Sequence, residues 1–280
     1  MREIFLICKD ILIIIRWIIE YFRYQRFQND FIFENKELPL FVMGNGPSLS
    51  KIAERLDERE KFNICTVNYS MSTDLFFKLK PEMHVFVDPV LFNTTDAKNK
   101  DLYEAFKKIT WKLLLFVPYG LTKEMATILK SNSNITVCRI PKQHLNIESR
   151  TLSKLEYAVY KKGWAAPCAM NVVVGAIFCG INIGYRKIFL FGVDHSWMKY
   201  ITVENNNDVC LEDQHYYGTE KRVWNRDESG ASLTMYELYF NFTILYDSYN
   251  RLKRYADYLD VKVINKTPGS FIDAFPKEID

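Results

Sequence analysis

Short apolar runs alternate with amphipathic segments through most of this chain, and that alternation constrains its fold more than any other feature. Runs of four or five residues rich in Val, Ile, Leu and Phe predict buried strands at 40–43, 63–67, 83–87, 113–117, 135–138, 187–191 and 261–264. Amphipathic patterns between them predict helices at 49–56, 102–108, 122–130, 169–179 and 233–258. Strands that alternate with helices form a mainly parallel sheet with helices on both faces. We therefore expect an α/β fold.

The composition describes a folded protein without a nucleic-acid surface. The chain has 280 residues, of which 48% are hydrophobic and 25% charged, and its formal net charge is only +3. The basic residues are scattered, so they provide no electrostatic footprint for nucleic acid. Six cysteines without a Cys-x-x-Cys pair predict reduced thiols in a cytoplasmic protein. The four histidines lack metal-ligand spacing, and we expect no metal site.

Residues 1–27 form an apolar segment that charged residues interrupt. Lys9, Asp10 and Arg16 break it before the roughly 20 apolar residues of a membrane span accumulate. On a helix, the following charged residues fall on one narrow stripe: Arg2, Lys9, Arg16, Glu20 and Arg23. Such a helix can lie in a bilayer interface, pack on the protein's own core, or form an oligomer interface. We expect residues 1–37 to be a membrane-surface helix and linker, followed by a single domain over 38–280.

A glycine-rich turn follows the first predicted strand. Its residues are Gly44, Asn45, Gly46, Pro47 and Ser48, and a helical pattern begins directly after it. Glycine lets the backbone come close to a ligand, and a helix N-terminus presents N–H groups to an anion. The turn is therefore either a phosphate site or an ordinary connection between a strand and a helix.

Other polar residues follow predicted strands in the same way. Asn68, Asp88 and Asp194 come at the ends of the second, third and sixth strands. The carboxyl ends of parallel strands share one edge of the sheet, where such folds bind ligands. We expect these residues to gather around one site with the glycine turn. The weakly periodic segments 140–166 and 199–232 would be lids over it.

Two stretches carry side chains suited to acid–base chemistry. Asp194 and His195 end a strand, and His215 is followed by Tyr216 and Tyr217. A histidine can act as a general base near neutral pH, although each of these could equally be structural. The chain has no Gly-x-Ser-x-Gly elbow and no Asp-x-Asp pair. Backbone N–H groups and phenols would then hold a phosphate without a metal.

The order of these motifs resembles the bacterial sialyltransferases of glycosyltransferase family 42. The resemblance runs from Leu38 to the C-terminus and includes Gly-Val-Asp at 192–194 and His-Tyr-x-Gly at 215–218. It implies a Rossmann-like domain with a lid, a CMP-activated sugar donor, no further cofactor and inverting, metal-independent transfer. By similarity, the residues that would meet the CMP phosphate and ribose are Asn45, Gly46, Ser48 and Asn68.

The chain departs from that family at three positions. The position of Asp88 is usually Asn in the family. The family's base is a histidine at the position of Thr219, and His215 matches an earlier histidine. The family's first phosphate-binding tyrosine falls at Ser196, so Tyr200, Tyr216 or Tyr217 would take its role.

A second resemblance, mainly over 184–275, is to 6-hydroxymethylpterin diphosphokinase-like proteins, on Gly-Val-Asp-His-Ser-Trp at 192–197 and His-Tyr-Tyr-Gly at 215–218. We expect a glycosyltransferase at the inner face of the cell membrane. It would move a sialic acid-like or Kdo-like sugar from a CMP donor to a glycan or lipid-linked acceptor in surface polysaccharide or lipooligosaccharide synthesis. A diphosphokinase-like transferase and a catalytically silent membrane scaffold are the alternatives, and the protein could be a homo-oligomer.

Overall fold

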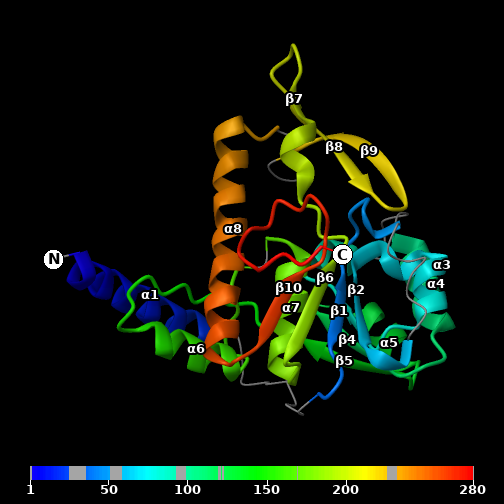
Figure 1. The fold of residues 1–280 in the computed structure, drawn as a ribbon, viewed down its shortest axis with the longest axis horizontal. Helices are drawn as coiled ribbons and strands as arrows, with labels where there is room; N and C mark the ends of the chain where they lie inside the picture. The colour runs from blue at the N-terminus through cyan, green and yellow to red at the C-terminus, as the bar shows by residue number, and fades with distance from the viewer. Residues whose placement is uncertain are drawn as a thin grey trace.

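A seven-stranded parallel sheet forms the centre of the protein (Figure 1). The computed structural model describes residues 2–24, 36–50, 59–92, 99–118, 121, 123–168, 170–225 and 232–279. The sheet order is β10-β6-β1-β2-β3-β4-β5, and every neighbouring pair is parallel. The strands are β1 (Leu40–Met43), β2 (Asn63–Val67), β3 (Met83–Val85), β4 (Leu113–Val117), β5 (Ile135–Arg139), β6 (Lys187–Phe191) and β10 (Lys262–Asn265). The predicted Rossmann-like α/β fold is confirmed.

Helices cover both faces of the sheet because the strands are apolar on both sides. On β4, Leu113 and Leu115 pack in one hydrophobic cluster, whereas Phe116 packs in the other. One face carries α3 (Asp74–Leu79), α4 (Lys100–Lys108) and α5 (Lys123–Lys130). The other carries α7 (Val172–Ile183) and α8 (Met235–Tyr258). Every residue of α7 is buried, because it lies between the sheet and α8. Of the helix predicted at 49–56, only residues 49 and 50 are described, and both are helical.

The chain reverses its direction of travel across the sheet between β1 and β6. Strands β1 to β5 run outward in sequence order, and the chain then returns to place β6 and β10 on the other side of β1. This reversal opens a crevice beyond the carboxyl ends of β1 and β6, where such sheets bind ligands. Short 3₁₀ helices follow or precede several strands: η1 (Arg59–Lys61), η2 (Asn68–Ser72), η3 (Pro89–Phe92) and η5 (Ser196–Tyr200).

A small antiparallel sheet stands above that crevice (Figure 1). It contains β7 (Ile201–Val203), β8 (Val209–His215) and β9 (Gly218–Val223), and it occupies much of the segment predicted as a lid at 199–232. The other predicted lid, 140–166, contains α6 (Ser153–Lys161), which packs beside α8 and α1. No residue of 140–166 lines the pocket described below.

The N-terminal helix α1 (Arg2–Tyr24) lies against the region of α6 and extends away from the sheet (Figure 1). Its Ile13, Ile14 and Trp17 pack on the main hydrophobic cluster, and Tyr21 is buried beside Trp164. Within the described ranges, no helix is both long enough and apolar enough to span a bilayer.

Candidate functional site

The pocket lies at the reversal point of the sheet, and the glycine turn at 44–48 forms its floor. Gly44 N donates to Phe191 O (2.8 Å) and Gly46 N donates to Gly192 O (2.8 Å), so the turn after β1 is hydrogen-bonded to the end of β6. A Cβ atom on Gly44 would lie 2.5 Å from Gly192 O. The close approach of these two backbones therefore requires glycine at position 44.

Asp194 holds the glycine turn in place. Its Oδ2 accepts a 2.8 Å hydrogen bond from the Ser48 hydroxyl, and it also occupies the space where a Cβ on Gly46 would lie. Burial raises the pKa of Asp194, although hydrogen bonds from Ser48 act in the opposite direction. Ser48 of the glycine turn thus engages the carboxylate of Asp194, which also lines the pocket.

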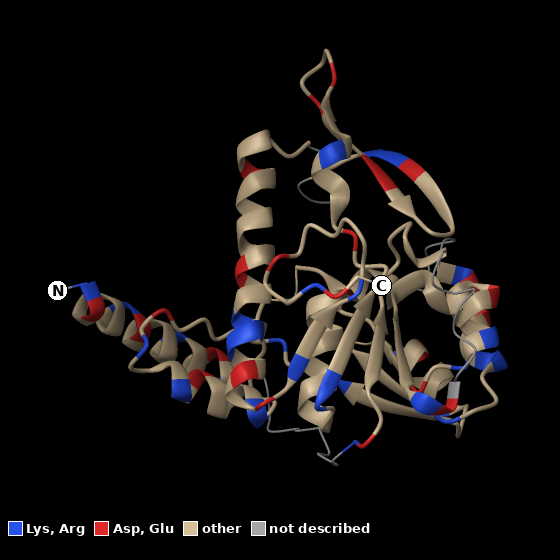
Figure 2. Ribbon diagram, in the orientation of Figure 1, with Lys and Arg blue, Asp and Glu red and all other residues tan. Residues whose placement is uncertain are grey.

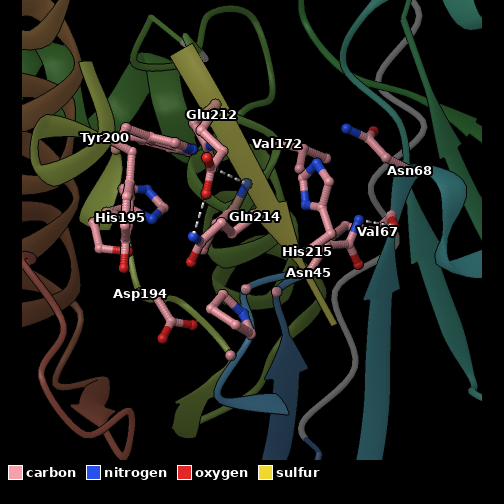
Figure 3. Close-up of a pocket in the computed structure, with 18 residues that line it drawn as sticks. Asn45, Val67, Asn68, Val172, Asp194, His195, Tyr200, Glu212, Gln214 and His215 are labelled. Carbon is pink, nitrogen blue, oxygen red and sulfur yellow. Dashed lines mark hydrogen bonds between the residues drawn. The ribbon is translucent and has the colours of Figure 1, made fainter. Parts of the chain in front are cut away.

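Two asparagines present unpaired oxygens at the ends of β1 and β2. Asn45 Nδ2 donates to Val67 O (3.2 Å), but its buried Oδ1 has no hydrogen-bond partner among the described residues. The buried Oδ1 of Asn68 likewise has none within the described part of the chain. Both residues line the pocket (Figure 3). A buried acceptor without a partner is costly, so these oxygens are suited to hydroxyl or amino groups of a ligand.

His84 supports Asn68 from below, a role that sequence reasoning did not identify. Its Nε2 lies 3.1 Å from Asn68 O, and its Nδ1 lies 2.7 Å from the Thr66 hydroxyl. Burial lowers the pKa of His84 to about 3, so the imidazole is neutral and its Nε2–H donates to the Asn68 carbonyl. This contact holds Asn68 in the left-handed conformation, with φ of 48°.

The N-terminus of α7 forms a second wall of the pocket. Asn171, Val172 and Val173 line it, and the Asn171 side chain accepts a 2.8 Å hydrogen bond from Val173 N as the helix cap. A helix start presents N–H groups and the positive end of its dipole. The predicted helix began at residue 169, so neither this cap nor its place in the pocket was expected.

The β8–β9 hairpin brings His215 into the lining of the pocket, beside Asn45 of the glycine turn (Figure 3). The hairpin is tied to the turn, because Tyr216 N donates to Asn45 O (3.0 Å). His215 Nε2 lies 3.5 Å from Asp213 Oδ2, and Arg222 Nη2 donates to the same oxygen at 2.9 Å. Asp213 can therefore orient the imidazole.

Asp213 stays ionised despite its partial burial. Burial alone would raise its pKa, but hydrogen bonding and charge from His215, the charge of Arg222 and a hydrogen bond from Trp197 outweigh burial and lower the pKa. The Trp197 Nε1–Asp213 Oδ1 distance is 3.3 Å. The hairpin and η5 are thereby joined through one carboxylate.

The two hairpin tyrosines flank the pocket without belonging to its lining. The Tyr216 hydroxyl lies 2.9 Å from Thr73 Oγ1, and the Tyr217 ring stacks on His215 with 5.0 Å between ring centroids. Burial raises the pKa of both phenols, so they are protonated at neutral pH. Thr219 lies in the exposed strand β9, paired with Gln214.

His195 lines the back of the pocket but is engaged by α8. Its Nε2 lies 2.7 Å from the Tyr249 hydroxyl, and its backbone is left-handed with φ of 51°. Burial lowers its pKa to about 3, so the ring is neutral. Ser196, Trp197 and Tyr200 continue this wall.

Asp88 lies apart from these residues. It is exposed, and its Oδ1 accepts a 3.0 Å hydrogen bond from Val90 N at the start of η3. Asp88 is not among the residues that line the pocket. The predicted residues that do line it are those of the glycine turn from Gly44 to Pro47, and Asn68, Asp194, His195 and His215. Among the described residues, no group of three His, Cys, Asp or Glu side chains is arranged to hold a metal ion.

The fold and the position of this pocket define a Rossmann-like α/β protein with its crevice at the reversal point of a parallel sheet. The family model for 6-hydroxymethylpterin diphosphokinase MptE-like proteins matches residues 18–199, and the chain belongs to that family. No curated protein matches the chain. Family membership makes the protein a transferase-type enzyme with nucleotide-dependent chemistry.

The match corrects the predicted extent of the resemblance to diphosphokinase-like proteins. We expected it mainly over 184–275, but it covers the sheet from before β1 to η5. It includes the glycine turn, Asn68 and Asp194 and ends before the β8–β9 hairpin. His215 and its partners therefore lie outside the matched region.

Proposed function

We propose that the protein transfers a sugar from a nucleotide-activated donor, a CMP-linked acidic sugar, to an acceptor hydroxyl. The observation that carries this proposal is the arrangement of one pocket. A histidine beside a carboxylate, His215 with Asp213, lines the same pocket as the glycine turn and the start of α7. A candidate base and a helix start suited to an anion therefore share one pocket, as transfer from a sugar phosphate requires.

His215 is the proposed general base. Donation from Nε2–H to Asp213 leaves the lone pair on Nδ1, which takes the proton of the acceptor hydroxyl. The acceptor oxygen attacks the anomeric carbon while the bond from that carbon to the phosphate oxygen breaks. CMP departs with the electron pair, and the sugar is transferred with inversion.

The leaving phosphate would be stabilised by backbone and phenol donors. The start of α7, with the positive end of its dipole, would act on one side, because Gly44 N and Gly46 N of the turn already donate to Phe191 O and Gly192 O. The protonated Tyr216 or Tyr217 hydroxyl, which flanks the pocket, would supply a donor on the other. The unpaired oxygens of Asn45 and Asn68 are suited to the ribose hydroxyls. None of these contributions requires a metal ligand from the protein.

The test is release of CMP from a panel of CMP-sugars by the purified protein, with and without EDTA. We expect release that EDTA does not inhibit, and about 100-fold or more loss of turnover in His215→Ala with CMP affinity kept. Thr219→Ala is the matched control on the hairpin and should retain activity. CMP binding without turnover for every donor would instead support a silent scaffold.

A diphosphokinase is the second candidate, because the matching family model is described as 6-hydroxymethylpterin diphosphokinase MptE-like. In that reaction the hydroxyl of a hydroxymethylpterin attacks the β-phosphorus of ATP, AMP leaves, and the diphosphate remains on the substrate. Formation of AMP from ATP, Mg²⁺ and 6-hydroxymethylpterin, abolished by EDTA, would support it over sugar transfer.

A further inference from the structure

The first observation concerns the face of α1 that is turned toward the protein. Asp10 is fully buried, and its two carboxylate oxygens accept hydrogen bonds from Glu148 N (3.0 Å) and Ser149 N (2.8 Å). Glu3 Oε1 accepts one from Thr151 N (3.2 Å). Two of the three acidic side chains of the helix therefore accept hydrogen bonds from the segment before α6. These contacts fix which face of α1 points outward.

The outward face is apolar along the whole helix. Eight large side chains on it have exposed fractions between 40% and 69%: Ile4, Phe5, Ile11, Leu12, Ile15, Ile18, Ile19 and Phe22. At about 100° per residue they fall within an arc of about 140° opposite Asp10. They extend over about 27 Å of helix at the usual rise per residue. An apolar strip of this size on the surface of a folded protein marks an interaction site.

Basic residues follow one margin of this apolar strip. By their helical spacing they are Arg2, Lys9, Arg16 and Arg23, and Glu20 is the one acid of α1 on that side. Figure 2 colours the basic and acidic residues along the ribbon. Lys9 and Arg16 form ion pairs with Glu148 (2.7 Å) and Glu20 (2.8 Å). Exposed pairs of this kind are weak, so both cations can turn to another anion. The outward charge of the helix is thus net positive.

The width of the apolar strip and the positive charge along its margin indicate what kind of partner covers it. A partner helix covers a narrow seam, whereas an arc of about 140° matches a flat apolar surface. A row of cations beside that arc matches the phosphates of anionic lipid headgroups. We propose that α1 docks parallel to an anionic bilayer surface, with the apolar strip immersed at the acyl boundary and the basic margin at the headgroups. The buried Asp10 makes this a fixed orientation of the whole domain.

The test is binding of the full-length protein to vesicles of phosphatidylcholine, alone or with about one third phosphatidylglycerol. We expect binding to the anionic vesicles and a loss of at least about tenfold for the triple variant Phe5→Gln, Leu12→Gln, Ile19→Gln. The matched control is Tyr236→Gln, Tyr239→Gln, Phe240→Gln, which removes comparably exposed apolar groups from α8 and should bind like the wild type. Arg2→Gln with Arg16→Gln should lower the affinity for anionic vesicles about fivefold per cation.

Cys8 gives a second readout that needs no substitution. It lies near the middle of the apolar strip and is exposed, while the other five cysteines are buried or partly buried. An environment-sensitive fluorophore on Cys8 should shift to shorter wavelength when anionic vesicles are added.

Two results would overturn the proposal. One is equal vesicle binding by the wild type and the α1 triple variant. The other is absence of vesicle binding together with a dimer that the triple variant converts to a monomer, which would assign the strip to a second copy. Unfolding transitions of all variants should match the wild type, since every replaced side chain is exposed.

Discussion

The Ser48 hydroxyl donates a 2.8 Å hydrogen bond to Asp194 and thereby joins the turn after β1 to the turn after β6. The two strands are neighbours in the sheet, and the pocket begins where they end. The shape of the pocket floor thus depends on a contact between residues 146 positions apart in sequence.

Replacing Asp194 should separate its role as an acceptor from its charge. Asp194→Ala leaves the Ser48 donor without an acceptor, which costs about 1–3 kcal/mol. Asp194→Asn keeps an acceptor oxygen and should cost clearly less. Urea unfolding of both variants at neutral pH measures the difference, and equal losses would show that the hydrogen bond contributes nothing.

The raised pKa of Asp194 determines whether the stability of the protein rises or falls with pH. Because burial favours its protonated form, the wild type loses stability relative to Asp194→Asn as the pH rises from below the ordinary value of 3.8 through the folded-state pKa. The same unfolding experiments, repeated as a pH series, should show this relative shift. An opposite trend would mean that the Ser48 contacts outweigh burial.

Gly46→Ala should destabilise the floor of the pocket, because the added Cβ atom has no space there. The added Cβ would overlap Asp194 Oδ2 and lie 2.7 Å from Gly192 O. Overpacking of this kind costs about 1–3 kcal/mol. In an Asp194→Ala background the cost of Gly46→Ala should be smaller, which a double-mutant cycle of unfolding free energies can measure. Additive costs would show that the Gly192 carbonyl alone sets the limit.

The central sheet was predictable because parallel strands are buried on both faces. The predicted bounds of β1, β2, β4 and β6 agree with the structure, since each strand is built mainly of apolar residues. The antiparallel hairpin was not predicted as strands, because all six residues of β9 are exposed and carry no apolar pattern. Strand β9 pairs with β8, and the polar residues of β8, such as Asp213 and His215, do not follow a pattern typical of a strand.

The part of the candidate site at the edge of the central sheet was predictable because its residues directly follow strands. The glycine turn, Asn68 and Asp194 meet because β1, β2 and β6 end at one edge of the sheet. Asp88 does not meet them, since β3 ends at Val85 and Asp88 turns toward η3 instead. The supporting contact from His84 to Asn68 depends on packing between neighbouring strands, which a single sequence does not reveal.

His84 should make the protein less stable in mild acid. Its pKa is about 3 in the folded state against an ordinary 6.5, so below pH 6.5 the unfolded chain binds a proton that the folded chain excludes. Stability is therefore full above 6.5 and falls with decreasing pH, by about 1.4 kcal/mol per pH unit for each such histidine.

His195 has the same shift and contributes equally, so His84→Gln should remove about half of the combined slope between pH 6 and 4. Urea midpoints measured across this range give the slope. A slope unchanged in His84→Gln would show that the imidazole is not excluded from protonation.

The Arg251–Glu156 pair should reveal how strongly α8 holds α6. Arg251 Nη1 donates to Glu156 Oε1 at 3.0 Å, and both side chains are almost completely buried. Glu156 also accepts from Ile147 N (2.9 Å). Arg251→Met leaves a buried carboxylate without its cation and should cost about 3–5 kcal/mol. Urea unfolding gives this cost directly.

Adding Glu156→Gln to Arg251→Met should restore part of the lost stability, because the neutral amide needs no cation and still accepts from Ile147 N. Burial already raises the pKa of Glu156 against the charge of Arg251, so without Arg251 the carboxyl takes up a proton more readily. The cost of Arg251→Met should therefore be smaller at about pH 5 than at about pH 8. A double variant no more stable than Arg251→Met, together with a pH-independent cost, would mean that Arg251 acts by filling space and not by its charge.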